Sequence, residues 1–324
     1  MSLLAPLVAG FDIGGTNVRG VLVDRAGHLV GADRLPRPHE PDGIVDSVVT
    51  LVARMGTDAG ADAHAVGVGC AGTVDRRGVV RASPNIPTLI EFPLADTLSK
   101  RLAMPVIVDN DATTATWAEV KTGAARGIRD VVFVALGTGI GVGIVLDGEL
   151  RRGAQGFAGE AGHMVISPEG PECVCGRRGC WEVFASGRAL GRLTQDAARE
   201  HRVPAIVEIA GGVIDDIRGE HVSELVAEGH PEALMMLDEL GWWVGLGLTN
   251  LVNVLDVSTA VIGGGLSEIG RPLIAAIRVG YNSLMHDSDH RPPLNIVGAL
   301  HGGRAGAIGA ALLAADELHQ PSRI

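Results

Sequence analysis

Three of the four cysteines lie within "GHMVISPEGPECVCGRRGCWE", residues 162–182. Cys173 and Cys175 are separated by one residue, which is too close for an easy disulfide, and a redox pair would prefer a Cys-x-x-Cys spacing. Three thiolates leave one of the four positions around zinc unfilled, and His163 stands ten residues before Cys173. Glycines beside Cys175 and Cys180 allow the chain to turn around one ion. We therefore predict a closed structural zinc site made of His163, Cys173, Cys175 and Cys180.

A closed zinc site has no open position at which to activate water. Its expected task is to shape the loop that carries Glu160, His163 and Glu182. The fourth cysteine, Cys70, belongs to an apolar run and is expected to be a small buried residue.

A second polar cluster, in "VDNDATTATWAEV" (108–120), lies between a predicted strand and a predicted helix. Asp and Asn are favoured helix caps, so capping alone is one interpretation of Asp109, Asn110 and Asp111. Capping needs one side chain, however, and three are present. Asp111 can accept the proton of a substrate hydroxyl while Asn110 binds a neighbouring hydroxyl. An ordinary pKa near 4 suffices for such a base in phosphoryl transfer.

Glycine clusters recur at three places in the chain. Each is consistent with an ordinary tight turn, but glycine-rich turns also expose backbone N–H groups that can bind phosphate. No Gly-Lys pair occurs, which excludes a Walker A loop. Asp12, just before the first cluster, is placed to hold hydrated Mg²⁺. The predicted nucleotide-binding residues are Asp12, Gly14, Gly15, Thr16, Asn17, Gly137, Thr138, Gly139, Gly263, Gly264 and Gly265.

Hydrophobic patterning predicts an α/β protein in which one arrangement occurs twice. Each half opens with a β-hairpin that carries glycines at its tip, and strands alternate with helices after it. Strands are expected within 7–24, 28–36, 65–70, 105–109, 130–153, 259–264 and 293–300, and helices at about 40–59, 93–103, 112–122, 186–256, 268–280 and 304–317. We expect an N-terminal domain of residues 1–123 and a C-terminal domain of residues 124–303, with the helix at 304–318 joining the first domain.

Charge and hydropathy restrict the function classes. The net charge of −11 argues against nucleic acid and anionic membranes as partners. The apolar stretch at 241–265 contains Asn250, Asn253 and Asp256, so we interpret it as a buried helix followed by a buried strand. The first residues lack the basic region of a signal peptide, which favours the cytoplasm.

As a set, these residues resemble the ROK family of sugar kinases and sugar-responsive repressors. "DIGGTNVRGVLVD" is similar to the first phosphate motif of the family, "LGTGIGVGIVLDGELRRGAQGFAGEAGH" to its signature, "CVCGRRGCWE" to its zinc motif and "VIGGGLS" to its adenosine motif. The resemblance covers nearly the whole chain. It implies the actin-like/hexokinase ATPase fold, with two duplicated RNase H-like domains and a cleft between them.

The resemblance also implies roles for individual residues. Asp111 would be the general base, and the sugar hydroxyls would be bound by Gly72, Asn85, Asn110, Glu160, His163 and Glu182. Two departures affect the predicted fit of the sugar. Thr113 and Thr114 stand where the usual pattern resembles Ala-Asn-Ala, and residues 83–94 lack the aromatic often found after the asparagine.

The implied activity is ATP- and Mg²⁺-dependent phosphorylation of the 6-hydroxyl of a hexose, with glucose as the first expectation. An N-acetylhexosamine, mannose or fructose kinase would use nearly the same residues, and a sugar sensor without catalysis is the alternative from another class. A family repressor carries a DNA-binding domain ahead of the first strand, and that strand is expected within about ten residues of Met1. Relatives of this kind are often dimers or tetramers, so a homo-oligomer is expected.

Overall fold

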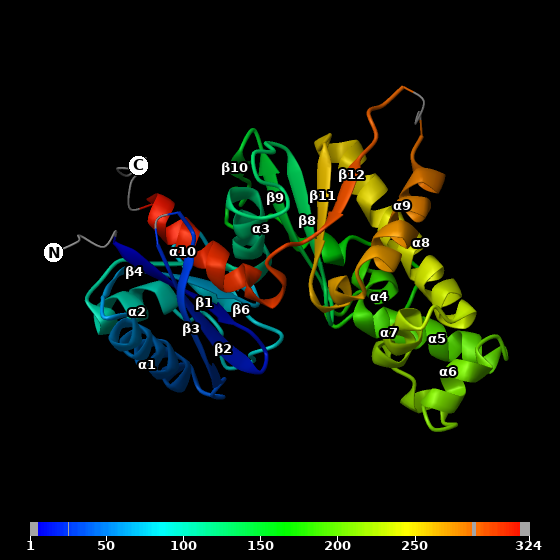
Figure 1. Ribbon diagram of the computed structural model, residues 1–324, viewed down its shortest axis with the longest axis horizontal. Helices are drawn as coiled ribbons and strands as arrows, with labels where there is room; N and C mark the ends of the chain where they lie inside the picture. Colours follow the sequence, from blue (N-terminus) through cyan, green and yellow to red (C-terminus); the bar gives the residue numbers. More distant parts are fainter. Residues whose placement is uncertain (1–5, 25, 287–289, 318–324) are drawn as a thin grey trace. The chain divides into compact units, whose positions relative to one another are not determined.

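The computed structural model describes residues 6–24, 26–286 and 290–317. The chain forms two compact units (Figure 1). The first unit takes residues up to 129, 143–159 and those from 303 onward, and the second takes 130–142 and 160–302. The domain boundary expected from the sequence, at 123/124, stays a prediction.

The first five-stranded sheet has the order β3-β2-β1-β4-β7. Its first three strands form an antiparallel meander, whereas β4 and β7 run parallel to β1. The strands are β1 (Leu7–Ile13), β2 (Asn17–Val23), β3 (Leu29–Pro36), β4 (Ala63–Cys70) and β7 (Val106–Asn110). This is the hairpin followed by alternating helices and strands that the pattern predicts.

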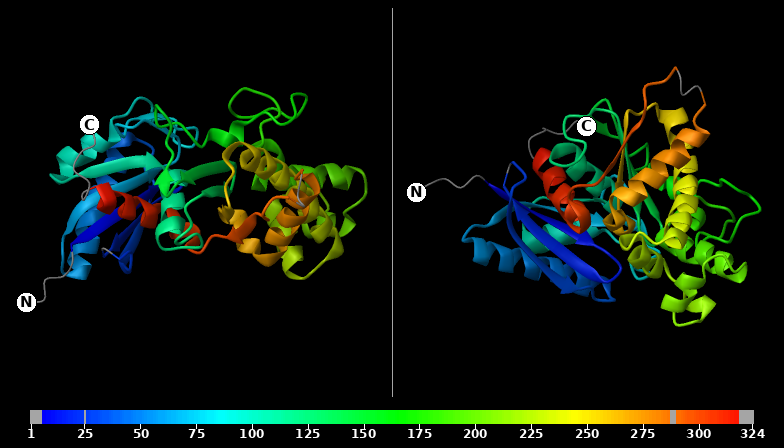
Figure 2. Two further views of the ribbon diagram at one scale, coloured as in Figure 1. Left: turned by 90° about the horizontal axis from the view of Figure 1, so that it is seen from above. Right: turned by 45° about the vertical axis from the view of Figure 1, so that its right-hand side comes forward.

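Two pairs of helices cover this sheet: α1 (Pro41–Ala59) with α2 (Leu94–Leu102), and α3 (Asp111–Lys121) with α10 (Ala305–Glu317). Residues alternate between the two faces of a strand. In β1, the side chains of Leu7, Ala9, Phe11 and Ile13 belong to the buried core that α1 covers. Gly10 faces the other way and lies against α10. The two helix pairs therefore lie on opposite faces of the sheet. Figure 2 shows α10, in red, beside the blue strands in both views.

Glycines allow α10 to lie unusually close to the strands. A Cβ atom on Gly10 would be 2.0 Å from the carbonyl oxygen of Ala307, and one on Gly67 would be 1.8 Å from that of Ala310. Real Cβ atoms do not approach backbone oxygens so closely, so any larger residue in β1 or β4 at these positions would displace the helix.

The second five-stranded sheet has the order β10-β9-β8-β11-β12. β11 runs parallel to both β8 and β12, and β10 pairs antiparallel with β9. Its strands are β8 (Val131–Leu136), β9 (Ile140–Leu146), β10 (Glu149–Leu150), β11 (Thr259–Gly263) and β12 (Asn295–Gly298). As predicted, the glycine cluster after β8 leads into another strand rather than into a helix.

The long helical region predicted at 186–256 is divided into several helices. The α-helices of the second unit are α4 (Glu182–Ala185), α5 (Gly187–Arg199), α6 (Pro204–Ile209), α7 (Gly219–Ala227), α8 (Pro231–Leu255) and α9 (Arg271–Leu284), and its 3₁₀ turns are η1 (Glu160–His163), η2 (Ile214–Asp216) and η3 (Gly265–Ile269). The helix predicted from about 268 begins at Arg271. Gly270 has φ +76°, which ends η3 and separates it from α9.

Three small elements complete the described residues. The short ribbon of β5 (Thr73–Val74) and β6 (Val80–Ala82) was not expected from the sequence, and η4 (Gly302–Arg304) precedes α10. Among the described residues, no helix combines the length and the apolar character needed to cross a bilayer. The apolar stretch at 241–265 is the end of α8 followed by β11, as expected.

Candidate functional site

The polar cluster at the end of β7 gives each of its three side chains a different set of partners. Asn110 caps α3, because its Oδ1 accepts hydrogen bonds from the N–H groups of Ala112 (2.9 Å) and Thr113 (3.1 Å). Its Nδ2 donates to the carbonyl oxygen of Gly72 at 3.0 Å. One residue therefore performs the capping, and Asp109 and Asp111 are left for other tasks.

Asp109 is 5% exposed and forms a buried ion pair. Its Oδ1 accepts from the N–H of Asn110 at 2.8 Å, and its Oδ2 accepts from Nε of Arg152. Arg152 also reaches Glu317 of α10, at 3.4 Å. A buried carboxylate requires such partners, so Arg152 fixes the backbone just before Asp111.

Asp111 is the first residue of α3, and its Oδ1 accepts from the N–H of Ala112 at 2.8 Å. Burial raises the pKa of this carboxyl group above its usual range, although hydrogen bonds partly oppose the rise. An ordinary pKa would suffice for such a base, and here the pKa of Asp111 is raised because desolvation disfavours the charged form. A raised pKa makes Asp111 a stronger proton acceptor than an exposed aspartate.

Asp12 lies near the end of β1, and its side chain is 17% exposed. Burial and the charge of Asp111 raise its pKa from 3.8 to about 6, against the lowering effect of Arg19. The register of the β1–β2 hairpin places Arg19 directly opposite Asp12, and their side chains approach to 3.5 Å. Gly306 of α10 leaves room here, since a Cβ on it would be 3.2 Å from the carboxyl carbon of Asp12. Asp12 and Asp111 thus form one acidic centre.

The first glycine turn closes with a hydrogen bond from the N–H of Gly14 to the carbonyl oxygen of Asn17, at 3.1 Å. Arg37 supports the turn from outside: its N–H donates to the carbonyl of Thr16 (2.8 Å) and its Nε to that of Gly15 (2.9 Å). A Cβ on Gly15 would lie 4.0 Å from that of the exposed Asn85. The turn, Asn85 and the acidic centre are all parts of the first unit.

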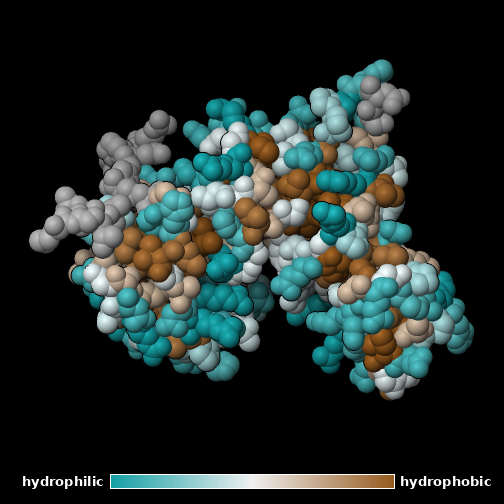
Figure 3. All heavy atoms as spheres, in the orientation of Figure 1, coloured by the Kyte–Doolittle hydropathy of each residue, from teal (hydrophilic) through white to brown (hydrophobic). Residues whose placement is uncertain are grey.

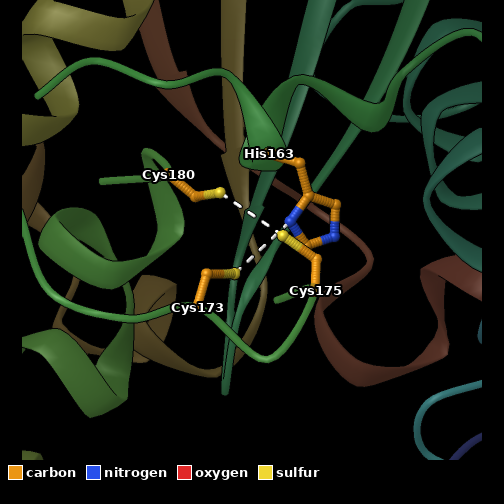
Figure 4. Close-up of side chains that lie close together, drawn as sticks. All are labelled: His163, Cys173, Cys175 and Cys180. Atoms are coloured by element: carbon orange, nitrogen blue, oxygen red, sulfur yellow. Dashed lines mark hydrogen bonds between the residues drawn. The ribbon is translucent and has the colours of Figure 1, made fainter. Parts of the chain in front are cut away.

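The cysteine cluster lies in the second unit (Figure 4). Sγ of Cys173 is 3.6 Å from Nδ1 of His163, Sγ of Cys175 is 3.6 Å from Sγ of Cys180, and the four donor atoms all lie within 4.8 Å of one another. Around a tetrahedral ion with Zn–S bonds of about 2.3 Å, two sulfur atoms would be about 3.8 Å apart. The donor set and its spacing therefore fit zinc. Cys70 is fully buried in β4, as expected.

Two carboxylates flank the ring of His163. Its Nδ1, which faces the thiols, is 3.6 Å from Oε1 of Glu182, and its Nε2 is 4.0 Å from Oε2 of Glu160. Oε1 of Glu182 also accepts from the Cys173 thiol at 2.9 Å. The ring nitrogen that does not face the thiols is thus directed toward Glu160, and the three residues of the second unit with a predicted sugar role form one group.

The second glycine turn, between β8 and β9, lies close to this group. Its Gly137 N–H donates to the Gly139 carbonyl at 3.0 Å, and Gly264 approaches the end of β8, where a Cβ would be 2.5 Å from the carbonyl of Leu136. Gly264 has φ +78°, so it is suited to this position both by its conformation and by its lack of a side chain. The second and third glycine clusters therefore lie together.

A pocket of about 1150 Å³ opens beside these turns, entirely within the second unit. Gly137, Thr138 and Gly265 line it together with residues of α5, including Arg188, and with residues of α7 and its N-cap, Arg218. Neither arginine is part of a pattern that marks it in the sequence. Arg188 is the second residue of α5, which begins at Gly187 after the capping residue Ser186.

Each unit thus brings together the predicted residues that it contains. In the first unit these are Asp12, Gly14, Gly15, Thr16, Asn17, Gly72, Asn85, Asn110 and Asp111, and in the second Gly137, Thr138, Gly139, Glu160, His163, Cys173, Cys175, Cys180, Glu182, Gly263, Gly264 and Gly265. The roles of single residues in binding and catalysis stay predictions.

The chain is similar in sequence and in structure to several known proteins. A glucokinase of Streptomyces coelicolor is 39% identical over 313 residues, which span 96% of this chain and 98% of the relative. The crystal structure of a ROK family glucokinase from Streptomyces griseus, in complex with glucose and AMPPNP, is also 39% identical and has a TM-score of 0.85, covering 96% of this chain and 99% of that one. A ROK hexokinase from Thermus thermophilus is 32% identical with a TM-score of 0.78, over 96% and 99%.

The two sheets with their helices have the actin-like/hexokinase ATPase fold. Residues 8–317 match the ROK family, and the chain belongs to that family.

Proposed function

We propose that this protein is an ATP-dependent kinase that transfers the γ-phosphoryl group to the 6-hydroxyl of glucose. The observation that carries the proposal is the 39% identity, over 96% of the chain, to a structure solved with glucose and an ATP analogue. The acidic centre of the first unit and the glycine-lined pocket of the second supply the chemistry that such a reaction needs.

In the proposed reaction, Asp111 takes the proton of the sugar 6-hydroxyl as that oxygen bonds to the γ-phosphorus. The bond from the γ-phosphorus to the oxygen bridging the β-phosphate breaks, and ADP leaves. In a loose transition state, positioning and charge neutralisation supply most of the rate. Asp12 would hold hydrated Mg²⁺, which neutralises charge on the phosphates.

Six residues are proposed to contact the sugar. Gly72, Asn85 and Asn110 would bind hydroxyls from the first unit, and Glu160, His163 and Glu182 from the second. Zinc on His163, Cys173, Cys175 and Cys180 would fix the imidazole ring, because a ligated histidine keeps one orientation. The ring nitrogen that faces Glu160 would then meet the sugar.

The nucleotide is assigned to the pocket of the second unit. The glycine turns at 137–139 and 263–265 would bind the phosphates and ribose through backbone N–H groups. Arg188 and Arg218 bring positive charge to the same pocket, which suits a triphosphate.

A coupled ADP-release assay tests the proposal directly. MgATP is offered with glucose, mannose, fructose, N-acetylglucosamine and N-acetylmannosamine, and Asp111→Asn serves as the matched control. We expect a clear preference for glucose, and ADP release at least about 100-fold slower from the variant. Faster ADP release with another sugar would identify that sugar as the substrate in place of glucose. The absence of ADP with any sugar, in protein shown to contain zinc, would overturn the proposal.

We propose further that the protein acts in the cytoplasm as a homo-oligomer. Apolar side chains reach the surface in patches, some of them over α9 (Figure 3), and Val254, Val279 and Trp242 are 81%, 68% and 39% exposed. Such surface is a candidate for contact with a second copy. Light scattering after size exclusion measures the mass, and a monomer at micromolar concentration would contradict the assignment.

A further inference from the structure

The segment between Cys180 and Gly187 contacts the second glycine turn at two points. Oε2 of Glu182 accepts from the N–H of Ile140 at 3.4 Å, and the N–H of Gly187 donates to the carbonyl oxygen of Gly137 at 2.8 Å. The turn between β8 and β9 is therefore held at both of its ends by one stretch of chain that starts at a predicted zinc ligand.

The two carboxylate oxygens of Glu182 face different partners, one the donor cluster and the other the glycine turn. Oε1 faces Sγ of Cys173 (2.9 Å) and Nδ1 of His163 (3.6 Å), while Oε2 faces the turn. A Cβ on Gly139 would be 2.4 Å from Oε2, so a larger residue there would push this carboxylate away from the turn. Glu182 thus bridges the donor cluster and the turn.

The backbone around Glu182 has little freedom to absorb a displacement. Trp181 is fully buried, its Nε1 donates to the carbonyl of Trp243 at 2.9 Å, and a Cβ on Gly247 would be 2.0 Å from its ring. On the other side, the Val183 carbonyl accepts from Arg192 at 2.9 Å. A shift of Cys180 would therefore be passed to Glu182 and the turn rather than being absorbed between them.

We infer that Glu182 is a positioning residue through which the zinc cluster sets the geometry of the turn at 137–140. Zinc content would then control affinity for a nucleoside triphosphate even when no sugar is bound. The inference rests on the proposed function, because Gly137 and Thr138 line the pocket assigned to the nucleotide. It differs from the predicted sugar role of Glu182, which requires no effect on nucleotide binding in the absence of sugar.

The experiment measures the Kd for MgAMPPNP by calorimetry without sugar, together with the zinc content of each protein. Glu182→Ala should keep its zinc and bind MgAMPPNP about tenfold more weakly, the loss expected for one misplaced hydrogen bond to a charged group. Cys175→Ala changes an exposed ligand and should lose zinc and show a similar rise in Kd. The double variant should be no weaker than either single one, because both changes act on one path.

Two further variants separate positioning from general damage. Glu182→Gln keeps an oxygen that can accept from Ile140, so its Kd should stay within about threefold of the unaltered protein. Glu172→Ala removes a carboxylate of the same loop that pairs with Arg178 at 2.9 Å and is 82% exposed, and both zinc content and Kd should remain unchanged.

The outcomes distinguish this inference from the proposed function. If the unaltered protein binds MgAMPPNP but Glu182→Ala and zinc-free Cys175→Ala bind it within twofold of the same Kd, the coupling is wrong and the kinase assignment stands. If the unaltered, zinc-containing protein neither binds MgAMPPNP nor releases ADP, the proposed function fails. Should Cys175→Ala not fold, Glu182→Ala and Glu182→Gln decide the question.

Discussion

At the scale of single residues, neighbours of the same chemical type have acquired different tasks. Asn110 caps α3, Asp109 pairs with Arg152, and Asp111 carries a raised pKa. The sequence shows why three polar residues exceed what capping requires, but it does not show which one caps. That choice depends on the direction of each side chain at the strand–helix junction.

Asp111→Asn tests the proposed base. We expect kcat to fall at least about 100-fold, because an amide cannot accept the proton and general bases contribute about 10²–10⁴. Glucose affinity, measured by calorimetry, should change by less than about threefold, since the amide preserves the size of the side chain. Full turnover by this variant would remove Asp111 as the base.

Asp12→Asn tests the raised pKa through stability. In the folded protein the pKa is about 6, compared with 3.8 for the free group, so the folded state binds more protons between these pH values and loses stability as pH rises through 6. Above pH 7 the variant should be more stable than the unaltered protein by about 3 kcal/mol, because it carries no desolvated charge. The difference should shrink toward zero near pH 4.

Urea unfolding without added Mg²⁺ at pH 4.5, 6 and 8 measures the effect of Asp12→Asn. Asp33→Asn, at a strand position where the carboxylate pairs with Arg54 at 3.6 Å, is the control and should show no such gain at pH 8. An Asp12→Asn protein that is less stable at pH 8 than at pH 4.5, relative to the unaltered chain, would reverse the predicted sign.

At the scale of elements, features formed by residues close in sequence could be predicted, whereas contacts between distant residues could not. The His/Cys cluster lies within a short stretch, and the hairpin tips are marked by glycine, so both could be recognised from spacing. The partner of Asp109 could not: Arg152 is 43 residues away, and no periodicity relates the end of β7 to the segment after β10. The β5–β6 ribbon was missed for a similar reason, because its strands are too short to show alternation.

Arg152→Met tests the ion pair with Asp109, which joins the segment after β10 to β7. Removing the arginine leaves the carboxylate of Asp109 buried without its partner, so we expect a loss of about 3 kcal/mol in the free energy of unfolding. Asp109→Asn/Arg152→Met should recover most of it, because the pair is then neutral. Urea unfolding of the four proteins completes the double-mutant cycle, and losses that simply add would show that the two residues are uncoupled.

At the scale of the whole molecule, the fold class was recognised from the sequence because the arrangement occurs twice, while the route of the chain was not. Residues 143–159 belong to the first unit, although in the sequence they stand between residues 130–142 and 160–302 of the second. No change in amino-acid composition marks the points at which the chain passes from one unit to the other. They follow from contacts such as Arg76 with the carbonyl of Gly153, at 2.9 Å, which only the folded chain brings together.

Gly67→Val tests the close packing of α10 on β4. The added carbons would meet the carbonyl of Ala310, a backbone atom that cannot rotate away, so the helix must move. We expect the unfolding free energy to fall by about 3 kcal/mol or more. Gly31→Ala is the control, since its Cβ would meet only Leu22 at 3.9 Å, and an unchanged thermal midpoint for Gly67→Val would contradict the tight contact.

The position of α10 also has a consequence for synthesis on the ribosome. β4 ends at Cys70 and α10 begins at Ala305, so about 235 residues are translated between the strand and the helix that covers it. At about 5–20 residues per second this takes roughly 12 to 47 seconds. For that period one face of the nascent first sheet has α3 but lacks α10, and chaperones can hold the surface left open until α10 emerges.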